Sequence, residues 1–172
     1  MIALPEKISG RIWRLGDHVN TDVLHPSSYF SLNEVRVKEG LLEGMERLRA
    51  DAKIDFLNEG FVIVAGENFG CGSSRETSVR ALRTCGVKGV VAASFARIFL
   101  RSLVNLGIPP FECREIQHWA KDGDLIHISL EYGSIELANA RCFPFSPIDP
   151  HIKKILEAGG LIPYLRRERD GI

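Results

Sequence analysis

The sequence predicts an α/β domain in which helices flank a partly parallel sheet. Between residues 61 and 113, apolar runs alternate with amphipathic stretches in the order strand, helix, strand, helix, strand, which favours parallel pairing. With 172 residues, the chain is long enough for one substantial core. Its 45% hydrophobic and 26% charged residues are typical of a globular protein. We therefore expect residues 1–172 to form a single domain.

The first third of the chain predicts one strand and one helix. Residues 7–15 alternate apolar and polar side chains, which indicates a half-exposed opening strand. A polar turn at 16–22 follows and leads into residues 23–26. Residues 31–53 carry charges at helical spacing around a few apolar positions, so we expect one helix there.

The centre of the chain predicts the parallel part of the sheet. Each apolar run is short and is followed by a helical pattern that ends at a glycine. Strands are expected at 61–65, 89–94 and 108–113, and helices at 76–85 and 95–106.

The last third predicts a hairpin and a helix. Strands at 124–130 and 134–137 are joined by a turn at 131–133, and a helix is expected at 149–158. Residues 166–170 mix charges of both signs, and we interpret them as a solvated tail from about residue 166.

Charge and hydropathy exclude several classes of function. Lysine plus arginine and aspartate plus glutamate both number 22, so the net charge of zero argues against a nucleic-acid or membrane surface. No segment approaches the roughly 18 consecutive apolar residues of a membrane span. The first residues lack the basic start and apolar stretch of a signal peptide. A cytoplasmic protein is therefore expected.

The four cysteines stand far apart in the sequence, with no C-x-x-C pair. Their spacing does not suggest a zinc site or an iron–sulfur cluster held by this chain. Cys85, Cys113 and Cys142 are interpreted as inert packing residues. Cys71 lies within a glycine-rich turn, where it is either a reactive thiol or simply a small residue that fits.

This glycine-rich turn is the strongest functional signal in the sequence. Residues 66–76 read Gly-Glu-Asn-Phe-Gly-Cys-Gly-Ser-Ser-Arg-Glu and connect a predicted strand to a predicted helix. Glycine lets the backbone approach a ligand closely, and unpaired N–H groups at a helix start favour an anion. Arg75 adds a positive charge that can bind a carboxylate through two hydrogen bonds. The turn therefore predicts a site for small acids.

The same residues also fit a structural role. Ser73 and Glu76 have the spacing of a capping box, in which each side chain satisfies a backbone N–H at the helix start. A cap alone needs no glycines, which favours the anion site without removing the alternative. Two phosphate-binding motifs are excluded, because no lysine follows Gly72 and Arg75 stands where a dinucleotide fingerprint needs its third glycine.

Four segments together resemble the swivel domain of the aconitase superfamily. They are the glycine turn at 70–76, the Asn-Thr-Asp segment at 17–26, and the stretches 93–99 and 105–109. The resemblance covers roughly residues 8–165. It implies the family's swivelling β/β/α domain, here as a free-standing chain similar to the small subunits of isopropylmalate dehydratases.

The resemblance also implies an enzyme that works only with a partner. The family catalyses dehydration and rehydration of hydroxy acids, and its 4Fe–4S cluster would be held by a separate large subunit, with none bound by this chain. A member of this kind would isomerise 2-isopropylmalate and 3-isopropylmalate in leucine biosynthesis. Self-association of the isolated chain stays open.

Residue roles follow from the same motifs. Ser73 would be the general base that removes the proton alpha to a carboxylate, while Ser74 and Arg75 would bind a substrate carboxylate beside the backbone of Gly72. Asp22 would help organise the site. His25 stands near the same pocket and is included as a candidate substrate contact, although the family has no histidine there.

The segment after the Asn-Thr-Asp turn is associated with substrate specificity in the family. Here this specificity loop comprises residues 28–32, Ser28, Tyr29, Phe30, Ser31 and Leu32, with Arg36 as the nearest cation in the sequence. An apolar branch suits such a loop better than an extra carboxylate, which favours an alkyl-substituted malate.

The chain departs from the family at one place, and alternatives to the leading function remain. Residues 77–79 read Thr-Ser-Val where most relatives have His-Ala-Pro, which leaves the exact substrate open. The alternatives are a dehydratase subunit for dimethylmalate or homoaconitate, and a non-catalytic carboxylate-binding module. RNA binding is disfavoured by the neutral charge.

Overall fold

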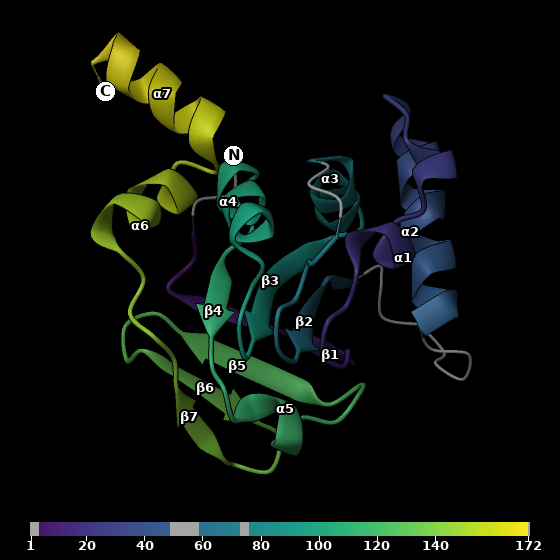
Figure 1. Cartoon of the computed structure of the whole chain (residues 1–172). Coiled ribbons are helices and arrows are strands. Elements are labelled where there is room, and N and C mark those ends of the chain that lie inside the picture. Colours follow the sequence, from purple (N-terminus) through teal and green to yellow (C-terminus); the bar gives the residue numbers. More distant parts are fainter. Residues whose placement is uncertain (1–3, 49–58, 73–75, 172) are drawn as a thin grey trace.

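A mixed sheet with strand order β4-β3-β2-β1-β5-β6-β7 forms the centre of the molecule (Figure 1). The computed structural model describes residues 4–48, 59–72 and 76–171. The strands are β1 (Lys7–Arg14), β2 (Phe61–Ala65), β3 (Val87–Ala92), β4 (Pro110–Glu112), β5 (Leu125–Ser129), β6 (Ser134–Leu137) and β7 (Cys142–Pro144).

The sheet changes direction at β1. On one side β1 pairs with β2 in parallel, and β2–β3 and β3–β4 continue in parallel. On the other side β1 pairs antiparallel with β5, and β6 and β7 follow as antiparallel neighbours. The predicted fold class, an α/β domain with a partly parallel sheet, is therefore confirmed.

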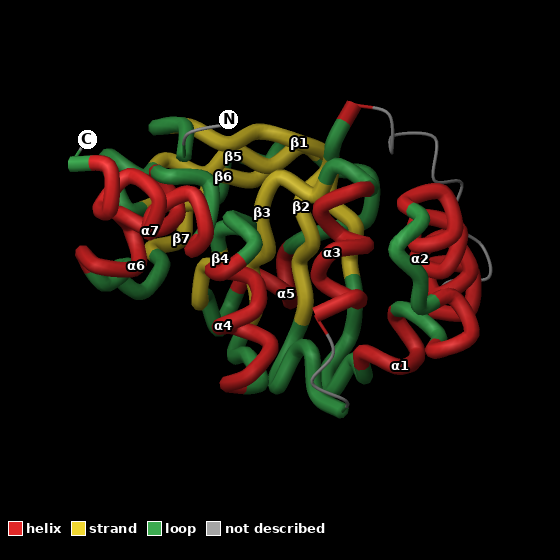
Figure 2. Tube along the Cα trace, turned by 90° about the horizontal axis from the view of Figure 1, so that it is seen from above, coloured by secondary structure: helices red, strands yellow, loops and turns green. Residues whose placement is uncertain are grey.

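Helices cover one face of the parallel half. In Figure 2, α3 and α4 lie against the strands and α2 packs outside α3. A hydrophobic core fills the space between them, with Trp13, Phe61, Ile63, Leu82 and Leu103 among its fully buried side chains. The helices are α1 (Thr21–Leu24), α2 (Glu34–Leu48), α3 (Glu76–Thr84), α4 (Arg97–Asn105), α5 (Ile116–Trp119), α6 (Pro150–Glu157) and α7 (Leu161–Asp170), with a 3-10 turn at Ser27–Tyr29.

The antiparallel half curls beneath the parallel half. A second core lies between the two halves, and Ile116 of α5 is part of it. Figure 1 shows α5 beside the antiparallel strands. Val62 and Val64 point into this core from β2, opposite Ile126 and Ile128 of β5. Both faces of β2 are buried, as expected for a strand in the middle of a covered sheet.

The opening strand is half-exposed, as its alternation predicted. Lys7, Arg11 and Arg14 are exposed, whereas Ile12 and Trp13 are fully buried. The sequence did not indicate that β1 lies in the middle of the sheet, between β2 and β5. Alternation within a short segment gives no information about which strands pair on either side.

The C-terminal residues also differ. Residues 166–170 were interpreted as a tail, but they form the end of α7, which projects from the body of the molecule (Figure 1). The helix begins after Gly160 and ends at Gly171, whose φ of 70° is left-handed. None of its residues is buried, so no apolar stripe marked it in the sequence.

Candidate functional site

The loops that follow β1 and β2 run side by side at the carboxyl edge of the parallel strands. Backbone hydrogen bonds join His18 N–H to Glu67 O (2.7 Å), Gly70 N–H to Val19 O (3.0 Å) and Thr21 N–H to Cys71 O (2.8 Å). This edge is where open α/β sheets bind ligands. The Asn-Thr-Asp segment and the glycine turn, which are far apart in the sequence, therefore form one unit.

Two glycines of the turn have no room for a side chain. Gly70 has a φ of 81°, and a Cβ atom there would lie 2.1 Å from the ring of Phe99. Gly72 has a φ of 100°, and its Cβ would lie 2.2 Å from Oδ1 of Asn20. Both the left-handed backbone and the close neighbours require glycine. A helix cap needs neither feature, so the turn has a geometry beyond capping.

Asp22 stands at the rim of this unit. Oδ1 of Asn20 caps α1 by accepting a 2.7 Å hydrogen bond from the backbone N–H of Asp22. The side chain of Asp22 is exposed, and the Asn20 side chain that accepts from its backbone N–H lies close to Gly72. Asn20 therefore acts as a turn former, and Asp22 faces solvent where a ligand could reach it.

The predicted base Ser73, which is also the serine of the capping box, and the predicted carboxylate-binding residues Ser74 and Arg75 lie outside the described residues. The positions on either side are described: Gly72 and Glu76 are both exposed, and α3 begins at Glu76. The three residues therefore connect the glycine turn directly to the amino end of a nine-residue helix. Of the departures at 77–79, Ser78 and Val79 are buried, so they are packing positions of α3.

The predicted specificity loop lies over α1 and α2. The Tyr29 hydroxyl donates to a carboxylate oxygen of Glu43 in α2, and this bond raises the pKa of Tyr29 and lowers the pKa of Glu43. Leu32 is 90% exposed. The loop therefore presents at least one apolar side chain outward while its neighbours are tied down.

His25 lies beneath this loop. Its side chain is fully buried, its ring stacks on Phe30 with centroids 5.4 Å apart, and Nε2 lies 3.0 Å from the carbonyl oxygen of Val37. Burial lowers the pKa of His25, the hydrogen bond to Val37 partly opposes this, and the charge of Arg80 lowers it further. A neutral ring that donates from Nε2 fits these contacts. His25 has no exposed surface for a substrate and supports Phe30 instead.

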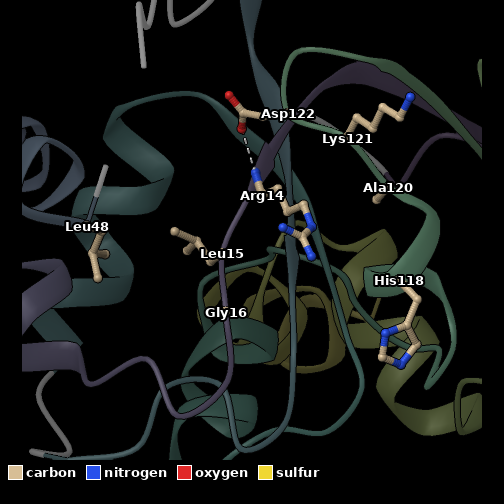
Figure 3. Close-up of a pocket in the computed structure, with 8 residues that line it drawn as sticks. All are labelled: Arg14, Leu15, Gly16, Leu48, His118, Ala120, Lys121 and Asp122. Atoms are coloured by element: carbon tan, nitrogen blue, oxygen red, sulfur yellow. Dashed lines mark hydrogen bonds between the residues drawn. The ribbon is translucent and has the colours of Figure 1, made fainter. Parts of the chain in front are cut away.

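A hollow of about 540 Å³ lies beside β1 and α5 (Figure 3). Asp122 accepts a 2.8 Å hydrogen bond from the backbone N–H of Arg14, and the Arg14 guanidinium donates to the carbonyl of Gln117. The basic side chains of His118 and Lys121 complete its polar lining. No predicted site residue that the structure describes lines this hollow, but Gly16 in its lining accepts a 3.0 Å hydrogen bond from the N–H of Gly66, the first residue of the glycine turn.

Comparison with known proteins identifies the family. The family described as the aconitase C-terminal domain matches residues 30–115. A 3-isopropylmalate dehydratase small subunit 1 of Thermotoga maritima is 38% identical over 164 residues, covering 93% of this chain and 95% of the relative. The chain belongs to the aconitase family. An isopropylmalate/citramalate isomerase small subunit of Methanocaldococcus jannaschii is 39% identical over 165 residues, covering 94% and 95%.

A solved member of the aconitase family has the same architecture. The crystal structure of a 3-isopropylmalate dehydratase from Methanocaldococcus jannaschii superposes with a TM-score of 0.83 at 38% identity, covering 95% of each chain. Within the family, this chain belongs with the small subunits of isopropylmalate isomerase-type hydro-lyases. The predicted resemblance to that group is confirmed.

The cysteines of this aconitase-family chain are dispersed. Desolvation raises the pKa of Cys85 to about 11 and also raises the pKa of Cys113, so both buried thiols stay protonated at neutral pH. Cys71 donates from Sγ to the carbonyl of His18 at 3.2 Å. Cys142 is exposed, so its interpretation as a packing residue was wrong; it lies on the short strand β7 with its side chain outward.

The described part of the chain contains neither a cluster of metal ligands nor a helix that could span a membrane. Across 4–48, 59–72 and 76–171, no three His, Cys, Asp or Glu side chains gather in a way that could hold a metal ion. In the same residues, no helix has the length and apolar character needed to span a bilayer.

Arg80 is the site-adjacent residue that the sequence did not single out. It lies on α3, and its guanidinium donates to the carbonyl of Ser31 in the specificity loop. In the sequence, Arg36 was the nearest cation to this loop, because position 80 belongs to a different helix. One signal in the sequence could have indicated it: Arg80 is surrounded by the apolar residues Val79, Ala81 and Leu82, which are all buried in the structure.

Proposed function

We propose that this chain is the small subunit of a heteromeric hydro-lyase that interconverts 2-isopropylmalate and 3-isopropylmalate. The observation that carries the proposal is the contact between the Asn-Thr-Asp segment and the glycine turn. A parallel β-bridge between Asn20 and Cys71 joins these two segments. This unit lies in a chain that matches isopropylmalate dehydratase small subunits over nearly their full length. The catalytic residues assigned by motif flank it directly.

The residues of this chain would move a proton and hold a carboxylate. Ser73 would take the proton alpha to the substrate carboxylate. An unperturbed serine is a poor base, so its alkoxide needs stabilisation from the N–H groups at the start of α3 and from Arg75. Ser74 and Arg75 would grip the carboxylate, with the backbone of Gly72 close to the ligand. Asp22 would help organise the site from the opposite rim.

The metal chemistry is assigned to the partner. The separated cysteines and the lack of a ligand cluster among the described residues do not fit an iron–sulfur site in this chain. A 4Fe–4S cluster in the large subunit would supply the Lewis acid for the substrate hydroxyl. Activity would then require both chains, and this small subunit would contribute the base and the carboxylate clamp.

The expected substrate has an apolar branch, and citramalate is the second candidate. Leu32 and Phe30 give the loop an apolar character, which favours the isopropyl group. The Methanocaldococcus jannaschii relative is named for both isopropylmalate and citramalate, which differ in the size of this branch. Dimethylmalate and homoaconitate remain candidates for the same site.

A reconstituted complex tests the function. The chain, together with its large subunit, should turn over 3-isopropylmalate, and the comparison should include citramalate, dimethylmalate and homocitrate. Turnover of homocitrate alone would contradict the loop argument. Ligand binding by the isolated chain, with no partner on co-purification, would favour the carboxylate-binding module.

A serine variant tests the mechanism. Ser73→Ala should assemble normally with the large subunit but lose about 10²–10⁴-fold in kcat, the usual contribution of a general base. Ser146→Ala, at an exposed position after β7, is the matched control and should keep full turnover. Substantial turnover by Ser73→Ala would remove Ser73 from the role of base.

A further inference from the structure

The specificity loop is fixed from one side by α1 and α2. Arg36 of α2 donates to the carbonyl of Ser28 at 2.8 Å, and Glu43 of the same helix accepts from Tyr29. Phe30 stacks on His25, the residue that ends α1. These contacts hold the first part of the loop, but they come from elements that do not carry the glycine turn.

Arg80 is the contact that reaches this loop from α3. Its Nη2 donates to the carbonyl of Ser31, across 49 positions of sequence. Its Nε is buried and has no hydrogen-bond partner among the described residues, so the guanidinium is packed rather than extended into solvent. A charged donor to a backbone carbonyl is among the stronger neutral-acceptor hydrogen bonds, and here it is partly shielded from water.

This contact joins the two parts of the candidate site. α3 begins at Glu76, immediately after the predicted base and carboxylate clamp, and Arg80 lies one helical turn further on. Ser31 lies between Phe30, which faces His25, and Leu32, which is 90% exposed. Phe30 is held by His25, so the position of the Ser31 carbonyl against α3 bears mainly on where Leu32 stands relative to the start of that helix.

We propose that Arg80 is a specificity-determining positioning residue: by holding the Ser31 carbonyl against α3, it sets the position of the apolar Leu32 relative to the start of that helix, and so selects substrates by the size of their side branch. This role rests on the proposed function. Arg80 itself does not touch the substrate, because the hydrogen bond to the loop backbone engages its guanidinium. Lysine could keep the charge but not the planar fork of donors.

Kinetics of the complex with its large subunit test the selection. In Arg80→Gln, KM for isopropylmalate should rise roughly tenfold, the change expected from loss of one charged hydrogen bond. Its kcat should stay within about threefold, because the base is untouched. KM for citramalate should change less, since a methyl group reaches the loop less. Arg80→Lys should fall between wild type and Arg80→Gln.

A matched control and a readout independent of activity complete the test. The matched control is Arg83→Gln, which changes the same residue type on the same helix. Arg83 is exposed and lines a different cavity, near the residues where β2 and β3 begin. This substitution should leave both KM values unchanged. Hydrogen exchange of the backbone amides at 27–33 should speed up in Arg80→Gln and not in Arg83→Gln.

Two results would overturn the proposal. Unchanged exchange at 27–33 in Arg80→Gln would show that Arg80 does not hold the loop. An equal loss of kcat for both substrates, with KM unchanged, would show general destabilisation rather than selection. If the wild-type complex turned over none of the hydroxy acids, the proposed function and the selection role would fall together, while the exchange data would still decide whether Arg80 anchors the loop.

Discussion

The glycine turn and the specificity loop border the same candidate site, but different forces hold them. Backbone hydrogen bonds to residues 18–21 fix the turn, together with a chain path that only glycine can follow at Gly70 and Gly72. Side chains that arrive from α2 and α3 fix the loop. Residues 66–72 of the turn therefore tolerate little change, whereas the loop can be altered by substituting residues outside it. This division suits an enzyme family that keeps its chemistry and varies its substrate.

A side chain at Gly70 is the strongest way to break the turn. Gly70→Ala should lower the free energy of unfolding by roughly 2–4 kcal/mol, because it combines a left-handed backbone with a clash against Phe99. Denaturant unfolding measures this. Gly16→Ala is the control: a Cβ there meets nothing within 4 Å, so the expected change is within about 0.5 kcal/mol. Equal effects of the two substitutions would contradict the backbone argument.

Neighbouring residues of the loop should respond differently to truncation. Phe30→Ala should lower the free energy of unfolding by roughly 1–3 kcal/mol, because it removes the partly buried ring that stacks on His25. Leu32→Ala should change it by less than about 0.5 kcal/mol, because that side chain is 90% exposed. Thermal unfolding of both variants gives the comparison. A larger loss in Leu32→Ala would mean that the loop is held from its outer side.

His25 makes the stability of the loop dependent on pH. Its folded-state pKa lies below the ordinary value of 6.5. Below pH 6.5 the unfolded chain therefore binds a proton at His25 more readily than the folded chain does. Its contribution is complete above pH 6.5 and declines as the pH falls below that value, by at most about 1.4 kcal/mol per pH unit. The gap in unfolding free energy between wild type and His25→Gln should therefore be larger at pH 7.5 than at pH 5.5. The same difference in unfolding free energy at both pH values would show that folding does not lower the pKa of His25.

The smallest effect is expected at the outer anchor of the loop. Tyr29→Phe removes the hydrogen bond that holds the pKa of Glu43 below its usual range, so an NMR titration should find that pKa higher in the variant. A carboxyl group whose pKa is lower in the folded state stabilises the fold at pH values above its unfolded-state pKa. This stabilisation is lost as the pH falls through its folded-state pKa. The stability change should be less than that of Phe30→Ala. Tyr132→Phe, at a side chain that is 77% exposed, should leave Glu43 unchanged.

Local patterns carried most of the fold prediction. The alternation of apolar runs and helical stretches predicted the parallel core, and the glycines at 70 and 72 marked the turn that the structure shows to be sterically required. In both cases the information lies within a few adjacent residues. Backbone geometry at a turn and burial of a short strand are local consequences of residue type, so a single sequence was sufficient.

Contacts between distant positions were not predictable in the same way. Arg80 and Ser31 are 49 positions apart, and no composition or spacing rule links an arginine on one helix to a carbonyl in a remote loop. The burial of His25 likewise depends on contacts between distant positions, since α2 and the ring of Phe30 both pack against its side chain. The central place of β1 was not predictable for a related reason: its second partner, β5, comes from a distant part of the sequence.

The central position of β1 has a consequence for synthesis on the ribosome. One edge of this strand pairs with β2, but the other pairs with β5, so that Lys7 lies opposite Ser129. A nascent chain that has emerged only as far as β4 therefore carries a completed parallel half with an open, apolar edge at β1. Unpaired edges of this kind template intermolecular pairing. The vulnerable period in the life of this protein is the interval between the emergence of β4 and the docking of β5.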